Sequence, residues 1–181
     1  ASREWVYLYI DNEVVELREA NHLVGMDTFA AEEQIKRELG KGERQISVVT
    51  IGPAGENLVK FAGIFADWGH SASHNGPGAV LGAKKLKAIA VARGKSPVAT
   101  KDKDRVAAIT DKLLEVAKKF PNFNWGTLPF VLINETLSVL PVKNYTTNVW
   151  TVGAEERAKF REEYIRGQFK PKQNPCWACQ Q

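Results

Sequence analysis

The sequence predicts an α+β protein in which a β-rich half, residues 1–97, precedes a mainly helical half, residues 98–181. The first half contains short runs rich in β-branched and aromatic residues, which are typical of strands. The second half carries apolar residues at spacings of three and four, which indicate amphipathic helices. The polar stretch KSPVATKDK (95–103) lies between the two patterns and is a plausible domain boundary.

The first half begins with an expected hairpin at 5–19, where WVYLYI and EVVELRE flank the turn residues Asp11-Asn12. A helix is expected at 27–39, because Asp27 can cap its N-terminus and apolar residues recur along it. Further strands are expected at 46–52, 58–67 and 86–92, with a short helix at about 78–85.

The second half opens with the strongest helical pattern of the chain, at 102–120. Its apolar positions are Val106, Ile109, Leu113, Val116 and Phe120. A second helix is expected at 126–137, with Pro129 in its first turn, where proline is tolerated. A third is expected at about 153–166, and GQFKPKQNP then leads to Cys176 as an extended segment.

Composition narrows the class of protein. The chain has 181 residues, of which 44% are hydrophobic and 25% charged, the balance of a soluble globular protein. The net charge of +4 favours anionic partners only weakly. The sequence contains no stripe of alternating basic and aromatic residues, so nucleic-acid binding is not predicted. No apolar run approaches the ~20 residues of a membrane helix. With no signal segment and two cysteines, a cytoplasmic location is predicted.

The densest cluster of unusual residues is DWGHSASHNGPGAVLG (67–82). It is expected to follow a strand and lead into a helix, with glycines that allow close backbone approach and several polar donors. That arrangement is suited to binding phosphate. It matches neither a Walker loop nor the dinucleotide fingerprint, and a tight connection with solvent-facing histidines is the alternative. A zinc pair of His70 and His74 would need a helix, which Gly76-Pro77-Gly78 forbids.

The only two cysteines, Cys176 and Cys179, form a Cys-x-x-Cys pair. A thioredoxin-like redox pair should open a helix after a strand, whereas Pro175 and an extended segment precede this one. A structural zinc site would need a second pair, and an iron–sulfur cluster would need two further cysteines. An incidental pair is also compatible with the sequence.

Four blocks, in order, resemble the tungsten-containing aldehyde:ferredoxin oxidoreductase family. They are IGPAGENLVKFAGI (51–64), GPGAVLGAKKLKAIAV (76–91), LPVKNY (140–145) and PCWAC (175–179). Members of that family are much longer, so the resemblance implies that this chain is an internal piece and is inactive alone. It would comprise the C-terminal part of the tungstopterin-binding domain, 1–97, and the start of the helical iron–sulfur domain, 98–181.

The resemblance implies the cofactors and the residues that bind them. The family holds tungsten, sometimes molybdenum, between two pterins whose phosphates are bridged by magnesium. The family segment that contacts them matches His70, Ser71, Ser73 and His74, although usual members have arginine at both histidine positions. Cys176 and Cys179 match the first two ligands of a 4Fe-4S cluster. Arginine grips phosphate permanently and bidentately, whereas histidine does not.

The implied reaction is oxidation of an aldehyde to a carboxylic acid, with electrons passing through the cluster to ferredoxin or a partner subunit. An oligomer is compatible with the sequence, and no catalytic residue is assigned. Two alternatives stay open: a subunit of the benzoyl-CoA-reductase type, or a non-catalytic binding module that has lost the cofactor. The histidines of the 70–74 segment favour the second alternative.

Overall fold

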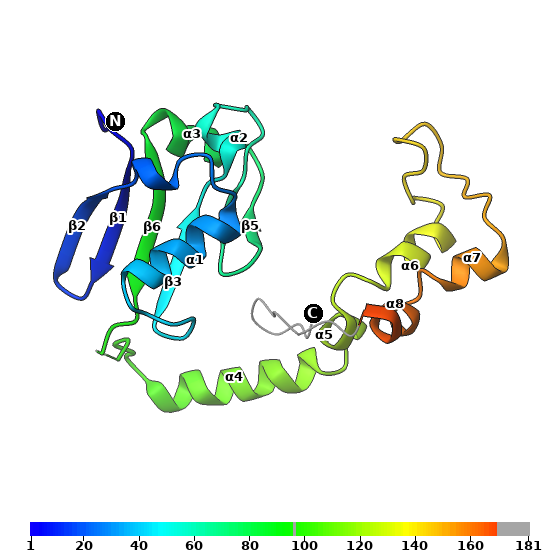
Figure 1. The fold of residues 1–181 in the computed structure, drawn as a ribbon. Helices are drawn as coiled ribbons and strands as arrows, with labels where there is room; N and C mark the ends of the chain where they lie inside the picture. The colour runs from blue at the N-terminus through cyan, green and yellow to red at the C-terminus, as the bar shows by residue number, and fades with distance from the viewer. Residues whose placement is uncertain (96, 170–181) are drawn as a thin grey trace. The chain divides into compact units, whose positions relative to one another are not determined.

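The computed structural model describes residues 1–95 and 97–169 (Figure 1). Its internal contacts divide the chain into two compact units, Ala1–Val98 and Ala99–Gln181. The first unit holds a six-stranded mixed sheet with helices, and the second is helical. The fold class is therefore α+β, as the sequence predicts.

The sheet of the first unit has the strand order β2-β1-β6-β3-β4-β5. Its strands are β1 (Val6–Asp11), β2 (Val14–Glu19), β3 (Ile46–Thr50), β4 (Ile64–Ala66), β5 (His70–Ala72) and β6 (Leu86–Ala92). β1 and β2 form the expected hairpin, and Asn12 takes the left-handed conformation that the turn requires, with φ 53°. β6 pairs parallel to β1 and antiparallel to β3, so the last strand of the unit lies in the middle of the sheet.

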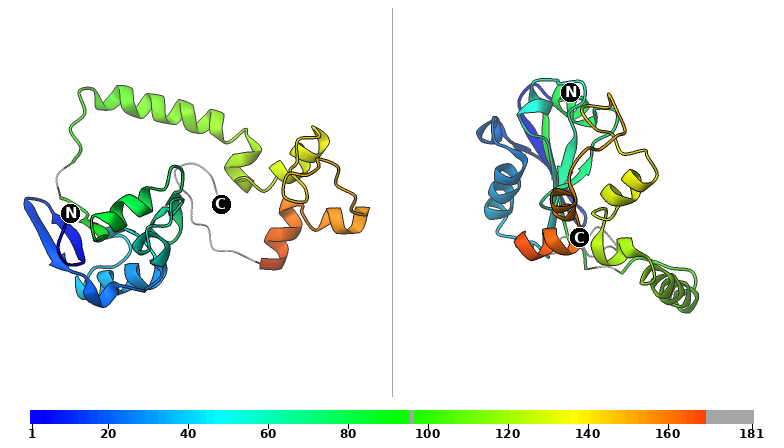
Figure 2. Two further views of the ribbon diagram at one scale, coloured as in Figure 1. Left: turned by 90° about the horizontal axis from the view of Figure 1, so that it is seen from above. Right: turned by 90° about the vertical axis from the view of Figure 1, so that its right-hand side faces the viewer.

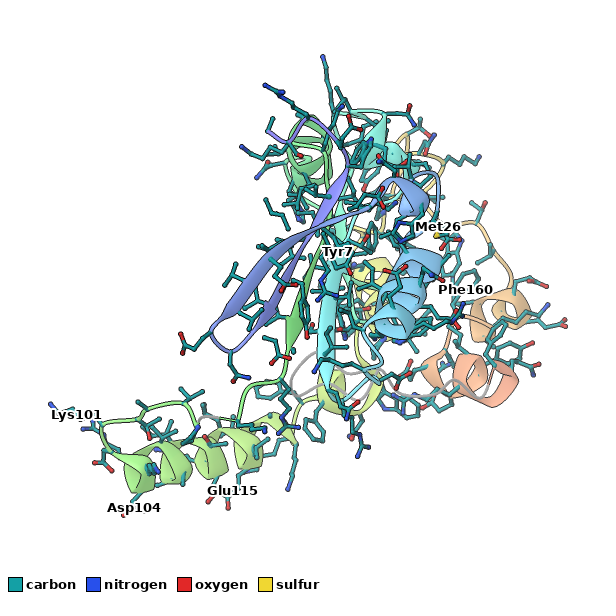
Figure 3. All side chains as sticks on the ribbon, turned by 60° about the vertical axis from the view of Figure 1, so that its left-hand side comes forward. Tyr7, Met26, Lys101, Asp104, Glu115 and Phe160 are labelled. Atoms are coloured by element: carbon teal, nitrogen blue, oxygen red, sulfur yellow. The ribbon has the colours of Figure 1, made fainter. Side chains whose placement is uncertain are left out.

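One face of this sheet packs against α1 (Thr28–Glu38), which lies beside β3 (Figure 1). Asp27 caps the helix as expected, accepting a hydrogen bond from the Ala30 amide at 2.8 Å. Tyr7 belongs to the buried core, and Met26 packs against it (Figure 3). Alternate residues of the strands supply most of this core: Tyr7, Tyr9, Ile46, Val48, Ala88, Ala90 and Ala92.

The segment between β3 and β6 differs most from the sequence-based expectation. The expected strand at 58–67 is reduced to β4, and the preceding residues form a short helix, α2 (Pro53–Glu56), followed by turns. These turns are closed by backbone hydrogen bonds from Val59 to Ala54 and from Ala62 to Val59, both 2.9 Å. In the first part of the run that predicted a strand, the backbone therefore forms hydrogen bonds with residues close in sequence and does not pair with a neighbouring strand. The expected helix at 78–85 is α3 (Pro77–Ala83).

The second unit begins with α4 (Lys103–Ala117), capped by Asp102, whose carboxylate accepts from the Arg105 amide at 2.9 Å. Figure 3 labels Asp104 and Glu115 along this helix, and Figure 2 shows its length from above. α5 (Pro121–Trp125) and α6 (Phe130–Thr136) follow; Pro129 is the N-cap residue of α6, just before its first turn. No helix among the described residues is long and apolar enough to span a membrane.

The single helix expected at 153–166 is wrong, because two helices occupy that stretch. They are α7 (Ala154–Ala158) and α8 (Glu162–Phe169), separated by a turn in which the Phe160 amide donates to the Arg157 carbonyl at 3.1 Å. Phe160 also packs edge-on against Trp150, with ring centroids 5.0 Å apart. Trp150 lies in the loop that precedes α7, so this contact joins the turn between the two helices to that loop.

Candidate functional site

The first three residues of the candidate ligand-binding segment, His70–Ala72, form the strand β5, where the sequence predicted a loop, and Ser73 and His74 follow this strand. β5 pairs antiparallel with β4 in the register Ile64↔Ala72, Phe65↔Ser71 and Ala66↔His70. It is the outermost strand at its side of the sheet in the described part of the chain. An outermost strand presents a row of backbone N–H and C=O groups that point away from its neighbour. The segment therefore offers backbone donors and acceptors in addition to its side chains.

A tight turn connects β4 and β5 and consists of three consecutive left-handed residues. Asp67, Trp68 and Gly69 have φ values of 42°, 64° and 120°. The Asp67 carboxylate accepts from the Ser47 hydroxyl at 2.6 Å and from the Val48 amide at 3.3 Å. The turn is thus fastened to β3, and its position decides where β5 begins.

The strand register separates the side chains that were expected to act together. Cross-strand neighbours share a face and successive residues alternate. Ser71 pairs with Phe65, which pairs with Thr50, so it lies on the face that carries α1. His70 pairs with Ala66, which pairs with Val49, so it lies on the opposite face.

The four candidate residues also differ in their exposure to solvent. His70 is half-buried, whereas Ser71, Ser73 and His74 are exposed.

The glycines after β5 bring backbone segments into close contact. Gly76 has φ 66°, and a Cβ built there would lie 1.9 Å from the Lys60 carbonyl oxygen. A Cβ on Gly82 would lie 1.9 Å from the carbonyl oxygen of Gly55 in α2. These positions require glycine because two backbones meet there. The sequence alone suggests instead that these glycines leave room for a phosphate.

The N-terminus of α3 does not serve the anion in the way the sequence suggested. Pro77 has no N–H group, and the Gly78 amide donates to the Ala62 carbonyl at 2.8 Å. The Ala79 amide donates to the Gly76 carbonyl at 3.2 Å. With these first-turn donors engaged, binding capacity at this site rests on β5 and the residues directly after it.

The donor set of this segment fits the groups of a phosphorylated cofactor. Hydroxyls of Ser71 and Ser73, the His74 imidazole and outward backbone amides all suit phosphate oxygens. An outward backbone carbonyl suits magnesium. No group of three or more His, Cys, Asp or Glu residues within 1–95 and 97–169 is arranged to hold a metal ion. Cys176 and Cys179 lie outside the described residues.

Sequence reasoning missed the residues behind the turn, Glu32 and Lys36. Their side chains are only 3% and 8% exposed, and they form an ion pair of 2.5 Å. A glutamate followed four residues later by a lysine normally marks a solvated helix face. Nothing in the pattern EEQIK distinguishes this buried pair from that common case, so the sequence contains no signal for it.

Comparisons with known proteins agree with the sequence blocks. The family model described as aldehyde ferredoxin oxidoreductase, N-terminal domain, matches residues 1–93. The chain is 35% identical over 179 residues to the tungsten-containing aldehyde ferredoxin oxidoreductase of Pyrococcus furiosus, covering 96% of this chain and 28% of the relative. It is also 35% identical to the enzyme of that name from Thermococcus kodakarensis, covering 98% of this chain and 29% of the relative.

A solved structure shares the fold as well as sequence. It is the active site complex BamBC of benzoyl coenzyme A reductase with 1,5-dienoyl-CoA, with TM-score 0.58 and 38% identity. The match covers 65% of this chain and 17% of that chain. The chain therefore spans less than a third of the length of each of these relatives.

Proposed function

The chain belongs to the aldehyde ferredoxin oxidoreductase family, and on this premise we propose that it is part of an enzyme that oxidises an aldehyde to a carboxylic acid. The cofactor would be a bis-pterin tungsten, or molybdenum, group with an associated magnesium ion. When bound, this group supplies the two-electron redox chemistry, and the protein positions and tunes it. The residues of this chain would bind and orient the cofactor.

The observation that carries the proposal is the exposed outer strand β5 with its polar side chains. Ser73 and His74 follow the strand and are exposed, and the turn at Gly76 closes the segment tightly. Hydroxyl and imidazole donors would meet the phosphate oxygens, and the Ser71 carbonyl would be a magnesium ligand. The His70 side chain lies on the opposite face of the strand from that of Ser71.

The electrons would leave through a 4Fe-4S cluster, with Cys176 and Cys179 as two of its ligands, to ferredoxin or an electron-transfer subunit. Cysteine thiolates are the usual ligands of such clusters, and the Cys-x-x-Cys spacing is typical of their first pair. The similarity to the Pyrococcus furiosus enzyme extends over 96% of the chain and supports this assignment.

Tungsten retention tests the role of the segment after β5. In holo-protein purified anaerobically, the double variant Ser73→Ala/His74→Ala is expected to bind cofactor at least about a hundredfold more weakly, because two hydrogen bonds to a charged phosphate are lost and each contributes about 1.5–3 kcal/mol. His70→Arg/His74→Arg should retain tungsten at least as well as the wild type, because arginine grips phosphate bidentately. Tungsten per chain is measured by mass spectrometry after dialysis.

A histidine distant from this strand provides the control for that experiment. His22 contacts Glu19 and Glu38 at 3.3 and 2.7 Å on another part of the first unit. His22→Ala should leave tungsten content unchanged. Wild-type retention in Ser73→Ala/His74→Ala would show that the segment is only a connection between β5 and α3.

Iron binding tests the cysteine pair. In the full-length protein reconstituted anaerobically with iron and sulfide, Cys176→Ser should abolish or strongly alter the cluster absorption, since thiolates are the ligands. Tungsten content measured in the same sample separates cluster loss from unfolding. An unchanged cluster spectrum in Cys176→Ser would remove this residue from the ligand set.

A second candidate function is supported by the match to the benzoyl coenzyme A reductase complex at 38% identity. In that case the same cofactor-binding segment would serve reduction of an aromatic thioester. Turnover of benzoyl-CoA by the metal-loaded protein, with no aldehyde oxidation, would decide for it. A protein that binds neither tungsten nor molybdenum would instead be a binding module that has lost the cofactor.

A further inference from the structure

The buried ion pair of α1 lies directly behind the turn that begins β5. Glu32 Oε1 is 2.5 Å from Lys36 Nζ, and both side chains are nearly inaccessible to solvent. Burying two charges costs desolvation free energy, and apolar residues of similar volume are often as good or better for stability. Stability alone therefore gives no reason for a charged pair at this place.

The second carboxylate oxygen of Glu32 shows what the pair does. Oε2 accepts the backbone N–H of Trp68 at 3.1 Å, across 36 residues of sequence. The Trp68 ring stacks on Phe29 of α1, with centroids 5.9 Å apart and planes at 26°. Lys36 Nζ lies 5.6 Å from the centre of the same ring. One helix therefore holds both the peptide group and the side chain of Trp68.

Trp68 is held in a conformation that it would not adopt unaided. Its φ of 64° is left-handed, and so is that of Asp67 at 42°. A bulky non-glycine residue in this region is uncommon, and such a conformation persists only where surrounding contacts determine it. The Glu32 carboxylate supplies one of those contacts. His70 lies two residues beyond Trp68, so the orientation of this peptide sets the starting point of β5.

We propose that Glu32 and Lys36 are positioning residues for the cofactor-binding strand β5. Lys36 holds the Glu32 carboxylate in place and aimed at the turn, and Glu32 fixes the Trp68 peptide and with it the register of β5 against β4. The identity of the ligand rests on the proposed function, whereas the positioning of the strand does not.

Two double variants separate positioning from stability. Glu32→Leu/Lys36→Met replaces the ion pair with apolar residues, so the unit should stay folded while the turn loses its acceptor. Glu32→Gln/Lys36→Met keeps an amide oxygen that can accept from Trp68 and should act as a rescue. Glu33→Gln is the control on the same helix, because Glu33 is exposed and pairs with Arg37 at 3.2 Å.

Hydrogen exchange of individual amides in the full-length protein is the first measurement. Glu32→Leu/Lys36→Met should speed exchange of the Trp68 and β5 amides about ten- to hundredfold, as expected for loss of a hydrogen bond to a charged group. Amides of β1 and β6 should exchange as in the wild type, and the rescue variant should restore protection. Unchanged exchange at Trp68 and β5, or equal acceleration throughout the sheet, would overturn the proposal.

Tungsten content is the second measurement and keeps the two hypotheses apart. In anaerobic holo-protein, Glu32→Leu/Lys36→Met should retain about tenfold less tungsten after dialysis, and the rescue variant should recover it. Loss of protection at β5 with full tungsten retention would overturn the link between positioning and cofactor binding. A wild-type protein without tungsten or molybdenum would refute the proposed function, and the exchange result would still decide the positioning role.

Discussion

Gly76→Ala is expected to destabilise the Ala1–Val98 unit by about 2–5 kcal/mol, because a methyl group there meets fixed backbone. The left-handed φ of 66° costs about 1–2 kcal/mol for an L-residue with a side chain. The added Cβ would lie 1.9 Å from the Lys60 carbonyl oxygen and 2.8 Å from its carbon, so Lys60 must move. Overpacking of this kind costs about 1–3 kcal/mol more.

The measurement should report on the first unit alone. Exchange of the slowest β3 and β6 amides gives the free energy of its global unfolding. Gly42→Ala is the matched control in the same unit, since its Cβ would find only the Gln45 side chain, at 3.8 Å. That variant should stay within about 0.5 kcal/mol of the wild type. A Gly76→Ala protein as stable as Gly42→Ala would contradict the close approach of the two backbones.

Glu56→Gln is expected to lower the free energy of unfolding of the Ala1–Val98 unit by about 3–5 kcal/mol, because it leaves the buried Lys87 ammonium without its counter-charge. Lys87 is fully buried on β6, and its Nζ lies 2.5 Å from Glu56 Oε1 and 2.9 Å from the Met26 carbonyl oxygen. Glu56 Oε2 also accepts from the Gly25 amide at 2.9 Å. This pair joins β6 and α2 to the loop before α1.

A double variant shows whether the lost stability comes from the unpaired charge. Glu56→Gln/Lys87→Met removes the ammonium, while the amide oxygen introduced at position 56 can still accept from Gly25, so it should recover most of the loss. Lys84→Met is the control for the lysine-to-methionine change, because Lys84 is exposed two residues before β6. The free energy of unfolding is again taken from exchange of the sheet amides. No recovery in the double variant would mean that packing, and not charge, dominates the cost.

Elements with a local cause could be predicted from the sequence. The β1–β2 hairpin follows from two β-rich runs around Asp11-Asn12, and α1 and α4 each begin at an aspartate that caps the helix. The strands β3 and β6 also lie where their apolar runs predict them. In each case the residues that specify the element are neighbours in sequence. Packing with distant segments does not alter the result.

Elements that depend on distant partners could not be predicted in this way. The run at 58–67 has strand composition, yet the Ala62 carbonyl accepts from Gly78 and only β4 pairs as a strand. The histidine and serine segment looked like a loop because it is polar and rich in small residues. Its first three residues become β5 because the preceding turn is held to β3 and α1 by hydrogen bonds that span 19 to 36 residues.

The sequence by itself determined the fold class, the family and the candidate ligand segment, because motif order and residue periodicity are written along the chain. Only the tertiary structure decided that His70 and Ser71 lie on opposite faces of a strand and that the glycines serve backbone packing. It also decided that the charges of Glu32, Lys36, Glu56 and Lys87 are buried. The physical reason is that burial and strand register depend on which distant segments meet, and spacing along the chain carries no record of that.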